Sequence, residues 1–207
     1  MAACLENCRD SGAAFAYDRE SVHDADLPEL YRQMIRLAAG SGLRIGDLPA
    51  LRVCDIDFHT GPIQVKRSSD QRSGKIGPCK NVTAYRSVFL GDPEGRKAMR
   101  QLKRFVNQYA VTGDALLFRS KRNRPLLETT VLNQGLYPAL EALNFQQAGL
   151  HAFRRGCNWR SELSGIVPAI IRQQMGHTPA AMTRLCSGVI PVEQVVAEFS
   201  AKRGKST

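Results

Sequence analysis

Apolar residues recur at helical spacing along most of the chain. Between residues 27 and 39 they lie on one face of a 3.6-residue period, which predicts a helix, and Asp26 is placed to cap its start. Gly40 and Gly42 should end this helix, and a short helix should follow over 43–51. The same periodicity, interrupted by glycines and prolines, predicts further helices over 94–109 (opened by Asp92), 129–143, 150–163, 167–174, 179–186 and 191–200.

Residues 55–90 follow a different pattern. The segments 63–65 and 85–90 alternate apolar and polar side chains with the period of two that is typical of strands. The stretch 68–83 between them is polar, Gly-rich and basic, which indicates a mobile connection. The expected fold class is therefore mainly α with one small antiparallel β-sheet (α+β). Residues 1–22 have weak periodicity and are expected to form an N-terminal arm or linker remnant.

Composition excludes several classes of protein. The chain has 207 residues, of which 43% are hydrophobic and 23% charged, as in globular proteins. It has no apolar run near the roughly 20 residues of a membrane helix and no visible secretory signal. The six cysteines form no Cys-x-x-Cys and no Cys/His cluster of zinc spacing, so we expect reduced thiols, a cytoplasmic or nuclear protein and no metal.

The charge points to a polyanionic partner. Lys and Arg number 29 against 19 for Asp and Glu, a formal net charge of +10. The cations are clustered, which favours a footprint on a phosphate backbone over a uniformly basic surface. The clusters are Arg96, Lys97, Arg100, Lys103 and Arg104 at helical spacing; Lys66, Arg67, Arg72, Lys75, Lys80 and Arg86 around the strands; and Lys121, Arg122 and Arg124 in a loop.

Four short segments carry side chains suited to holding a phosphodiester. Each segment alone is common by chance, and their order along the chain carries the weight. They are Ser-Gly-Leu-Arg-Ile-Gly-Asp-Leu over 41–48, with Arg44 and Asp47; Pro-Cys-Lys over 78–80, followed by Arg86; His-Ala-Phe-Arg over 151–154; and Met-Gly-His over 175–177.

In order and spacing, these segments resemble the boxes of the tyrosine recombinase (phage integrase) family over about residues 24–200. The resemblance implies a tyrosine recombinase catalytic-domain fold, of the DNA breaking–rejoining type, over 23–207. Members of this family usually carry an N-terminal core-binding domain that clamps the other side of the DNA. Residues 1–22 are too few for it, so we expect this domain to be absent.

The resemblance also implies site-specific DNA recombination or integration by transesterification, in which a tyrosine attacks the scissile phosphate and forms a 3′-phosphotyrosyl intermediate. Arg44 and Arg154 would bind the non-bridging oxygens through planar, bidentate hydrogen bonds and stabilise the transition state. Lys80, with Lys75 as the runner-up, would protonate the leaving 5′ oxygen. His151 would exchange protons with the nucleophile or hold the phosphate, because imidazole side chains in general can gain or lose a proton near neutral pH.

The remaining site residues follow from the same resemblance. His177 would add a hydrogen bond to the phosphate and Asp47 would support Arg44. Contacts to DNA are assigned to Lys75, Arg86 and Arg155. No metal or other cofactor is expected, because cationic side chains supply the electrostatic stabilisation.

The chain departs from the family at the nucleophile. The tyrosine should lie nine residues after His177, where this chain has Cys186, and no tyrosine occurs after Tyr137. Three explanations fit: an engineered nucleophile mutant, a natural relic that kept DNA binding, and attack by the cysteine itself. The last is the least favoured, because a thiol stops short of the position of a phenol oxygen and a displacement of about 1 Å can cost about 10²-fold in rate. We therefore expect no DNA cleavage by this chain.

The expected partners are double-stranded DNA and further copies of this chain, as a dimer or tetramer on DNA, with no membrane. The protein should be cytoplasmic and DNA-associated, or nuclear in a eukaryote. Three alternatives stay open: a non-catalytic DNA-binding relic of a recombinase, a type IB topoisomerase-like enzyme, and a basic RNA- or ribosome-associated protein. An aromatic content of 7% argues against the last.

Overall fold

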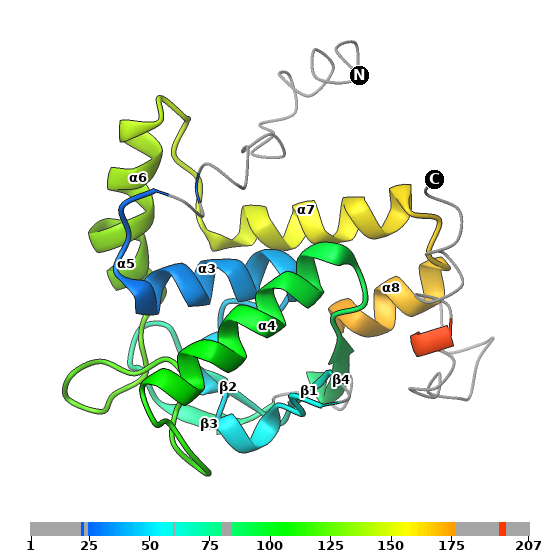
Figure 1. The fold of residues 1–207 in the computed structure, drawn as a ribbon, viewed down its shortest axis with the longest axis horizontal. Coiled ribbons are helices and arrows are strands. Elements are labelled where there is room, and N and C mark those ends of the chain that lie inside the picture. Colours follow the sequence, from blue (N-terminus) through cyan, green and yellow to red (C-terminus); the bar gives the residue numbers. More distant parts are fainter. Residues whose placement is uncertain (1–21, 23–24, 60, 80–83, 177–194, 198–207) are drawn as a thin grey trace.

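A computed structural model describes residues 22, 25–59, 61–79, 84–176 and 195–197. The central element is α3 (Glu29–Ser41), and both α4 (Pro93–Gln108) and α7 (Leu150–Leu163) pack against it (Figure 1). α8 (Pro168–Met175) follows α7 at one end of the molecule. The other end is formed by α5 (Glu128–Val131), the π-helical turn η5 (Leu132–Leu136) and α6 (Tyr137–Ala142).

The strands form two small antiparallel pairs. β1 (Pro62–Val65) pairs with β4 (Arg86–Phe89), so the predicted strands are confirmed. β2 (Arg67–Ser69) pairs with β3 (Ile76–Pro78), so the expectation of a mobile connection over 68–83 was wrong for residues 68–78. The turn between β2 and β3 is ordered by Asp70, whose carboxylate accepts hydrogen bonds from the backbone N–H groups of Arg72 and Ser73 at 2.9 and 2.7 Å.

The start of α3 differs from the prediction. The helix begins at Glu29 with Pro28 at the N-cap, and no side chain caps it, so the assignment of Asp26 as the cap was wrong. The reason is Pro28, because a proline disfavours helical backbone in the residue before it. At the other end the helix runs through Gly40 and stops at Gly42, which has a left-handed φ of 63°.

The remaining helices agree with the prediction to different degrees. α7 has the predicted bounds, and α4 opens as expected with Asp92 accepting a 2.7 Å hydrogen bond from the N–H of Gly95. The helix predicted over 43–51 is reduced to the 3₁₀ turn η2 (Leu48–Ala50), and a second 3₁₀ turn, η3 (Val53–Asp55), follows. The helix predicted over 179–186 lies outside the described residues, as does that over 191–200 except for the helical residues 195–197.

The core consists of two clusters. The larger one surrounds α3 and includes Val22, the last residue of the predicted arm, which is fully buried. The smaller one gathers around α8 and contains Cys157, Ile166, Ile170, Ile171, Met175 and Val195. Because α8 belongs to its own cluster, polar contacts also help to fix it against the main core.

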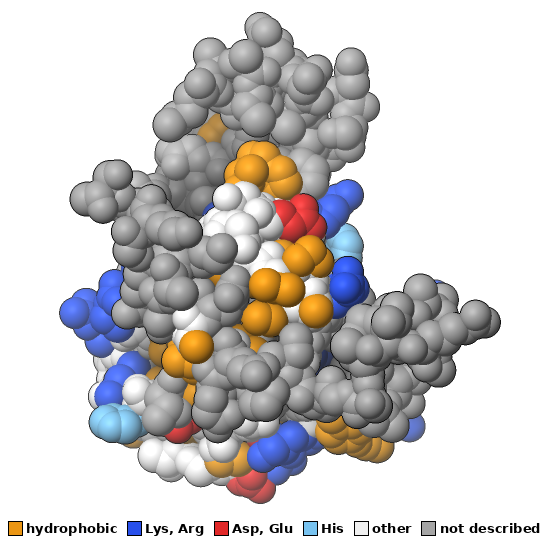
Figure 2. Space-filling model, turned by 90° about the vertical axis from the view of Figure 1, so that its right-hand side faces the viewer, with side chains coloured by type: hydrophobic (Ala, Val, Ile, Leu, Met, Phe, Trp, Pro, Cys, Tyr) orange, Lys and Arg blue, Asp and Glu red, His pale blue; other side chains and the backbone are white. Residues whose placement is uncertain are grey.

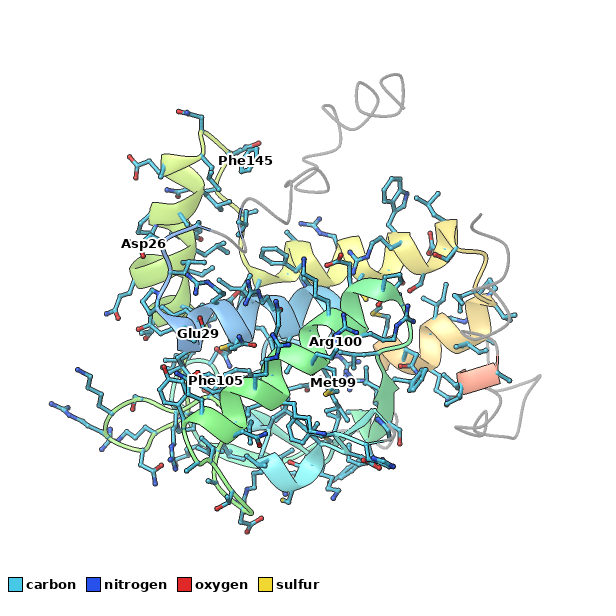
Figure 3. All side chains as sticks on the ribbon, in the orientation of Figure 1. Asp26, Glu29, Met99, Arg100, Phe105 and Phe145 are labelled. Carbon is cyan, nitrogen blue, oxygen red and sulfur yellow. The ribbon has the colours of Figure 1, made fainter. Side chains whose placement is uncertain are left out.

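Two surfaces stand out. At the α8 end, hydrophobic side chains gather in the middle of the described surface, with Lys and Arg beside them (Figure 2). The exposed apolar residues of α7 and its connection to α8 are Trp159, Leu163 and Val167. On α4, Met99 and Phe105 belong to the buried face, whereas Arg100 is exposed to solvent (Figure 3). Among the described residues, no helix combines the length and the apolar character needed to cross a bilayer.

The glycine that ends α3 is predicted to be important for stability. A Cβ on Gly42 would lie 2.6 Å from Met175 Cε and 3.2 Å from Cys157 Sγ, in a backbone conformation that side chains disfavour. We expect Gly42→Ala to lower the free energy of unfolding by about 2–3 kcal/mol, measured by urea denaturation. Gly113→Ala is the control, because Gly113 also has a positive φ (57°) but nothing lies within 4 Å of its Cβ position. Its loss should be only about 1 kcal/mol, and equal losses in the two variants would contradict the predicted clash.

Candidate phosphate-binding site

Three arginine side chains meet at the C-terminal end of α8. Arg86 Nε donates to the carbonyl of Gln174 at 2.8 Å, Arg154 Nη2 to that of Met175 at 2.6 Å, and Arg44 Nη2 to that of Gly176. The last carbonyls of a helix lack partners within the helix and carry its negative partial charge. The guanidinium groups supply both the missing hydrogen bonds and the opposite charge.

Arg44 is placed by the turn that follows α3. The left-handed Gly42 ends the helix, and Asp47 Oδ2 accepts the backbone N–H of Arg44 at 3.2 Å. The N–H of Asp47 in turn donates to the carbonyl of Arg44 at 2.9 Å. This closed turn leaves Arg44 half-buried, with its side chain directed to the end of α8. Asp47 therefore holds the backbone of Arg44 in this turn.

Arg154 lies on the inner face of α7 and is 5% exposed. Besides Met175, its guanidinium donates to the carbonyl of Gly42 through Nη1, so it joins α7 to both the end of α3 and the end of α8. Burial lowers the pKa of Arg154 to about 10, and the neighbouring charges of Arg86 and Arg44 act in the same direction. The group is still protonated at neutral pH, and a bound anion would relieve its repulsion with the other two arginines.

Arg86 and Asp47 form a buried ion pair at 2.8 Å, with side chains 3% and 2% exposed. Burial lowers the pKa of Arg86, and the Asp47 carboxylate opposes this shift. The sequence assigns Arg86 to the DNA-contacting set, but in this structure its guanidinium lies in the interior. The strand alternation could have shown this, because Arg86 shares the core-facing side of β4 with Val88.

The other predicted site residues of the described chain are at the surface. His151 and Arg155 are exposed on α7 and line, together with Arg154 and Met175, an open cavity of about 320 Å³. His151 is therefore brought to the same cavity as Arg154. Lys75 is exposed in the turn between β2 and β3, and no described contact joins it to the arginines.

Lys80, His177 and Cys186 lie outside the described residues. The residues directly before Lys80 and His177, which are Cys79 and Gly176, are described and lie at the arginine cluster. Gly176 accepts the hydrogen bond from Arg44, and Cys79 is buried beside the ion pair. Burial and the Asp47 carboxylate raise the pKa of Cys79, and Arg86 and Arg44 oppose that shift.

Sequence analysis missed Gln174. Its side-chain oxygen accepts the N–H of Phe89 at 2.7 Å, which attaches α8 to β4 next to the arginine cluster. A signal was present, since Gln174 is a polar residue on the same buried face of α8 as Ile170 and Ile171.

The arrangement is suited to binding an oxyanion. Each guanidinium has five N–H donors, so the donors of Arg44 and Arg154 that are not bonded to the carbonyls of Gly42, Met175 and Gly176 are available to a ligand. Among the residues that the structure describes, the cluster brings together the three arginine cations and the carboxylate of Asp47. Within the described part of the chain, no group of three or more His, Cys, Asp or Glu side chains could hold a metal ion.

Comparison with known structures shows the same fold. The integrase of transposon Tn1549 in complex with circular intermediate DNA superimposes with a TM-score of 0.64 at 18% identity, covering 88% of this chain and 64% of that one. XerA recombinase gives 0.61 at 16% identity, covering 96% and 66%. The lambda integrase catalytic core gives 0.53 at 19% identity, covering 77% and 91%. This chain thus covers a little under two thirds of the Tn1549 integrase chain in that structure, which is itself only part of that protein.

At the level of sequence, no curated protein matches significantly. The model of the phage integrase family, by contrast, matches residues 19–185, a range that contains Arg44, Arg86 and Arg154. Because this range is most of the chain, and because its fold is that of known recombinases, the chain belongs to the phage integrase family.

Proposed function

We propose that this chain is the catalytic domain of a site-specific DNA recombinase or integrase, and that the arginine cluster binds the phosphodiester at which strands are exchanged. One observation carries the proposal: Arg44 and Arg154, far apart in the chain, reach the adjacent carbonyls of Gly176 and Met175. Two guanidinium groups held this close can bind both non-bridging oxygens of one phosphate.

The proposed reaction is transesterification. A nucleophile attacks the phosphorus, the 5′ oxygen leaves, and a 3′-phosphoryl link to the protein forms. Arg44 and Arg154 would stabilise the charge that develops on the non-bridging oxygens, and their contacts with α8 keep them oriented before DNA binds. His151, exposed in the same cavity as Arg154, would exchange a proton with the nucleophile or hold the phosphate. Lys80 would protonate the leaving oxygen and His177 would hold the phosphate.

The nucleophile position is occupied by Cys186 in this chain. We propose that the chain as it stands binds DNA and does not cleave it, because a thiol is too short to replace the phenol of the family tyrosine. A DNA-binding relic of a recombinase is the second candidate. It differs from an engineered mutant only in whether the other proposed catalytic residues still support cleavage once a tyrosine is restored at position 186.

We further propose that several copies of the chain assemble on DNA. Related lambda integrase structures are described as a dimer bound to a core site and a tetramer bound to a Holliday junction. In this chain, Leu163 and Val167 are 67% and 45% exposed at the α8 end, where an apolar patch could be covered by a second copy (Figure 2).

Restoring the tyrosine is the direct test of the catalytic proposal. We expect Cys186→Tyr to form a covalent protein–DNA adduct, detected by denaturing electrophoresis after incubation with a pool of nicked duplexes of randomised sequence. Adding Arg154→Ala should lower adduct formation by about 10²-fold or more, because one preorganised donor to the transition state is lost.

The control for folding is Arg154→Lys in the same Cys186→Tyr chain. It keeps the buried charge but cannot donate in two fixed directions, so it should also lose most of the adduct while its circular dichroism stays unchanged. An absence of adduct in Cys186→Tyr, with DNA binding retained, would favour the relic. Relaxation of supercoiled DNA without a specific site would favour the topoisomerase alternative.

The DNA-binding face can be tested without a known target site. Arg155 is exposed beside the site cavity, so we expect Arg155→Ala to reduce the slope of log K against log salt concentration by about 0.9, the value for one lost phosphate contact. Lys121→Ala is the comparison, because Lys121 belongs to a different basic cluster, in the loop between α4 and α5 at the end of the molecule opposite α8 (Figure 1). We expect the slope to change less in this variant than in Arg155→Ala. Fluorescence anisotropy with a random duplex gives both slopes, and a larger change in Lys121→Ala would place the DNA elsewhere.

A further inference from the structure

The geometry points to Arg86 as a positioning residue: we infer that it sets the placement of Arg44 and Arg154 relative to each other and makes no contact with DNA. This inference rests on the proposed function for its consequence in catalysis. Its structural part stands on the contacts of Arg86 alone.

Every nitrogen of the Arg86 guanidinium has a partner inside the protein. Nε donates to the carbonyl of Gln174 at 2.8 Å, Nη1 to the carbonyl of Ala84 at 3.0 Å, and Nη2 to Asp47 Oδ2 at 2.8 Å. The side chain is 3% exposed and, unlike Arg154, it does not line the described cavity that contains His151 and Arg155. It joins three segments that are distant in the chain: the turn after α3, the start of β4 and the end of α8.

The connection to Arg44 runs through Asp47. The same carboxylate oxygen, Oδ2, accepts both the Arg86 Nη2 bond and the backbone N–H of Arg44. If the ion pair between Arg86 and Asp47 is lost, Asp47 becomes a buried carboxylate without its cation, which is strongly unfavourable. The turn that carries Arg44 would then rearrange to hydrate or re-pair that charge.

The connection to Arg154 runs through the end of α8. Arg86 holds the carbonyl of Gln174, next to the Met175 carbonyl that Arg154 holds. Arg86 also packs directly under the turn at Gly176, where a Cβ would lie 3.0 Å from Arg86 Cδ and 3.1 Å from Nε. Gly176 has a left-handed φ of 64°, so only glycine combines this backbone with so close an arginine.

Arginine suits this position because its planar fork donates in several fixed directions. A lysine could retain the ion pair with Asp47, but its single nitrogen cannot also reach the carbonyls of Ala84 and Gln174 as the guanidinium does. Arg86→Lys therefore preserves charge and removes the connection between the segments. This makes it the variant of choice for separating positioning from electrostatics.

A matched control exists at Arg160. Its Nη2 donates to the carbonyl of Ala39 at 2.5 Å and its Nε lies 3.6 Å from Asp92 Oδ2, so it too joins a carbonyl and a carboxylate from different helices. None of these contacts involves Arg44, Arg154 or the end of α8. Arg160→Lys thus shows how the loss of a comparable arginine contact elsewhere in the fold changes hydrogen exchange and adduct formation.

The first measurement is amide hydrogen exchange by mass spectrometry on the otherwise unchanged chain. We expect Arg86→Lys to accelerate exchange by about tenfold or more in residues 170–176, where the carbonyl contact of Arg86 is lost. Arg86→Ala, which also leaves the Asp47 carboxylate without its cation, should accelerate exchange in residues 42–48 as well. Arg160→Lys should leave both segments within about twofold of the parent. Equal acceleration in Arg86→Lys and Arg160→Lys, no acceleration of 170–176 in Arg86→Lys, or none of 42–48 in Arg86→Ala would overturn the inference.

The second measurement uses the Cys186→Tyr chain. Arg86→Lys should lower the rate of adduct formation at saturating DNA by about tenfold or more while the affinity for a random duplex stays within about twofold, and Arg160→Lys should change neither. A large loss of affinity with an unchanged rate would show that Arg86 contacts DNA instead. If Cys186→Tyr forms no adduct even with Arg86 intact, the proposed function fails, and the exchange result still decides whether Arg86 positions the two arginines.

Discussion

The hydrogen bonds between three guanidinium groups and the last carbonyls of α8 are the interaction on which the site depends. Like charges separate unless something holds them, and here the negative end of a helix holds Arg44, Arg86 and Arg154 at consecutive carbonyls. The carbonyl oxygens occupy part of the guanidinium groups of Arg44 and Arg154, and the remaining donors of these two side chains are left for the oxygens of an anionic ligand. A phosphate would meet a cluster whose orientation has already been set.

The rest of the fold can be understood as the means of bringing these segments together. α3 carries the turn with Arg44, and α7 packs on α3 so that Arg154 also reaches the carbonyl of Gly42. The β1–β4 pair brings Arg86 to the same place, and Gln174 ties α8 to β4 through the N–H of Phe89. Because α8 packs in a separate apolar cluster, these polar contacts decide where its end lies.

The buried ion pair of Asp47 and Arg86 shows how the scaffold handles excess positive charge. Among the groups described in the cluster, Asp47 is the carboxylate, and it serves Arg86 and the backbone of Arg44 together. The Asp47 carboxylate does not cancel the repulsion between Arg154 and the other two arginines. Burial, together with the charges of Arg86 and Arg44, lowers the pKa of Arg154 to about 10. Arg154 therefore keeps its charge at neutral pH, which favours binding of a phosphodiester whether or not the nucleophile is present.

The sequence by itself determined the helical framework and the β1–β4 pair, because periodicity is a local property. The resemblance of its short segments to the family boxes singled out Arg44 and Arg154 as candidates, and it placed Cys186 where the family tyrosine is expected. Only the tertiary structure decided that Arg86 points inward to Asp47, that residues 67–78 form an ordered hairpin, and that the end of α8 gathers the arginines. These three features depend on which groups, distant in the sequence, come into contact in the folded chain. The position of an arginine in the sequence is the same whether its guanidinium group binds a phosphate or a carbonyl of its own chain.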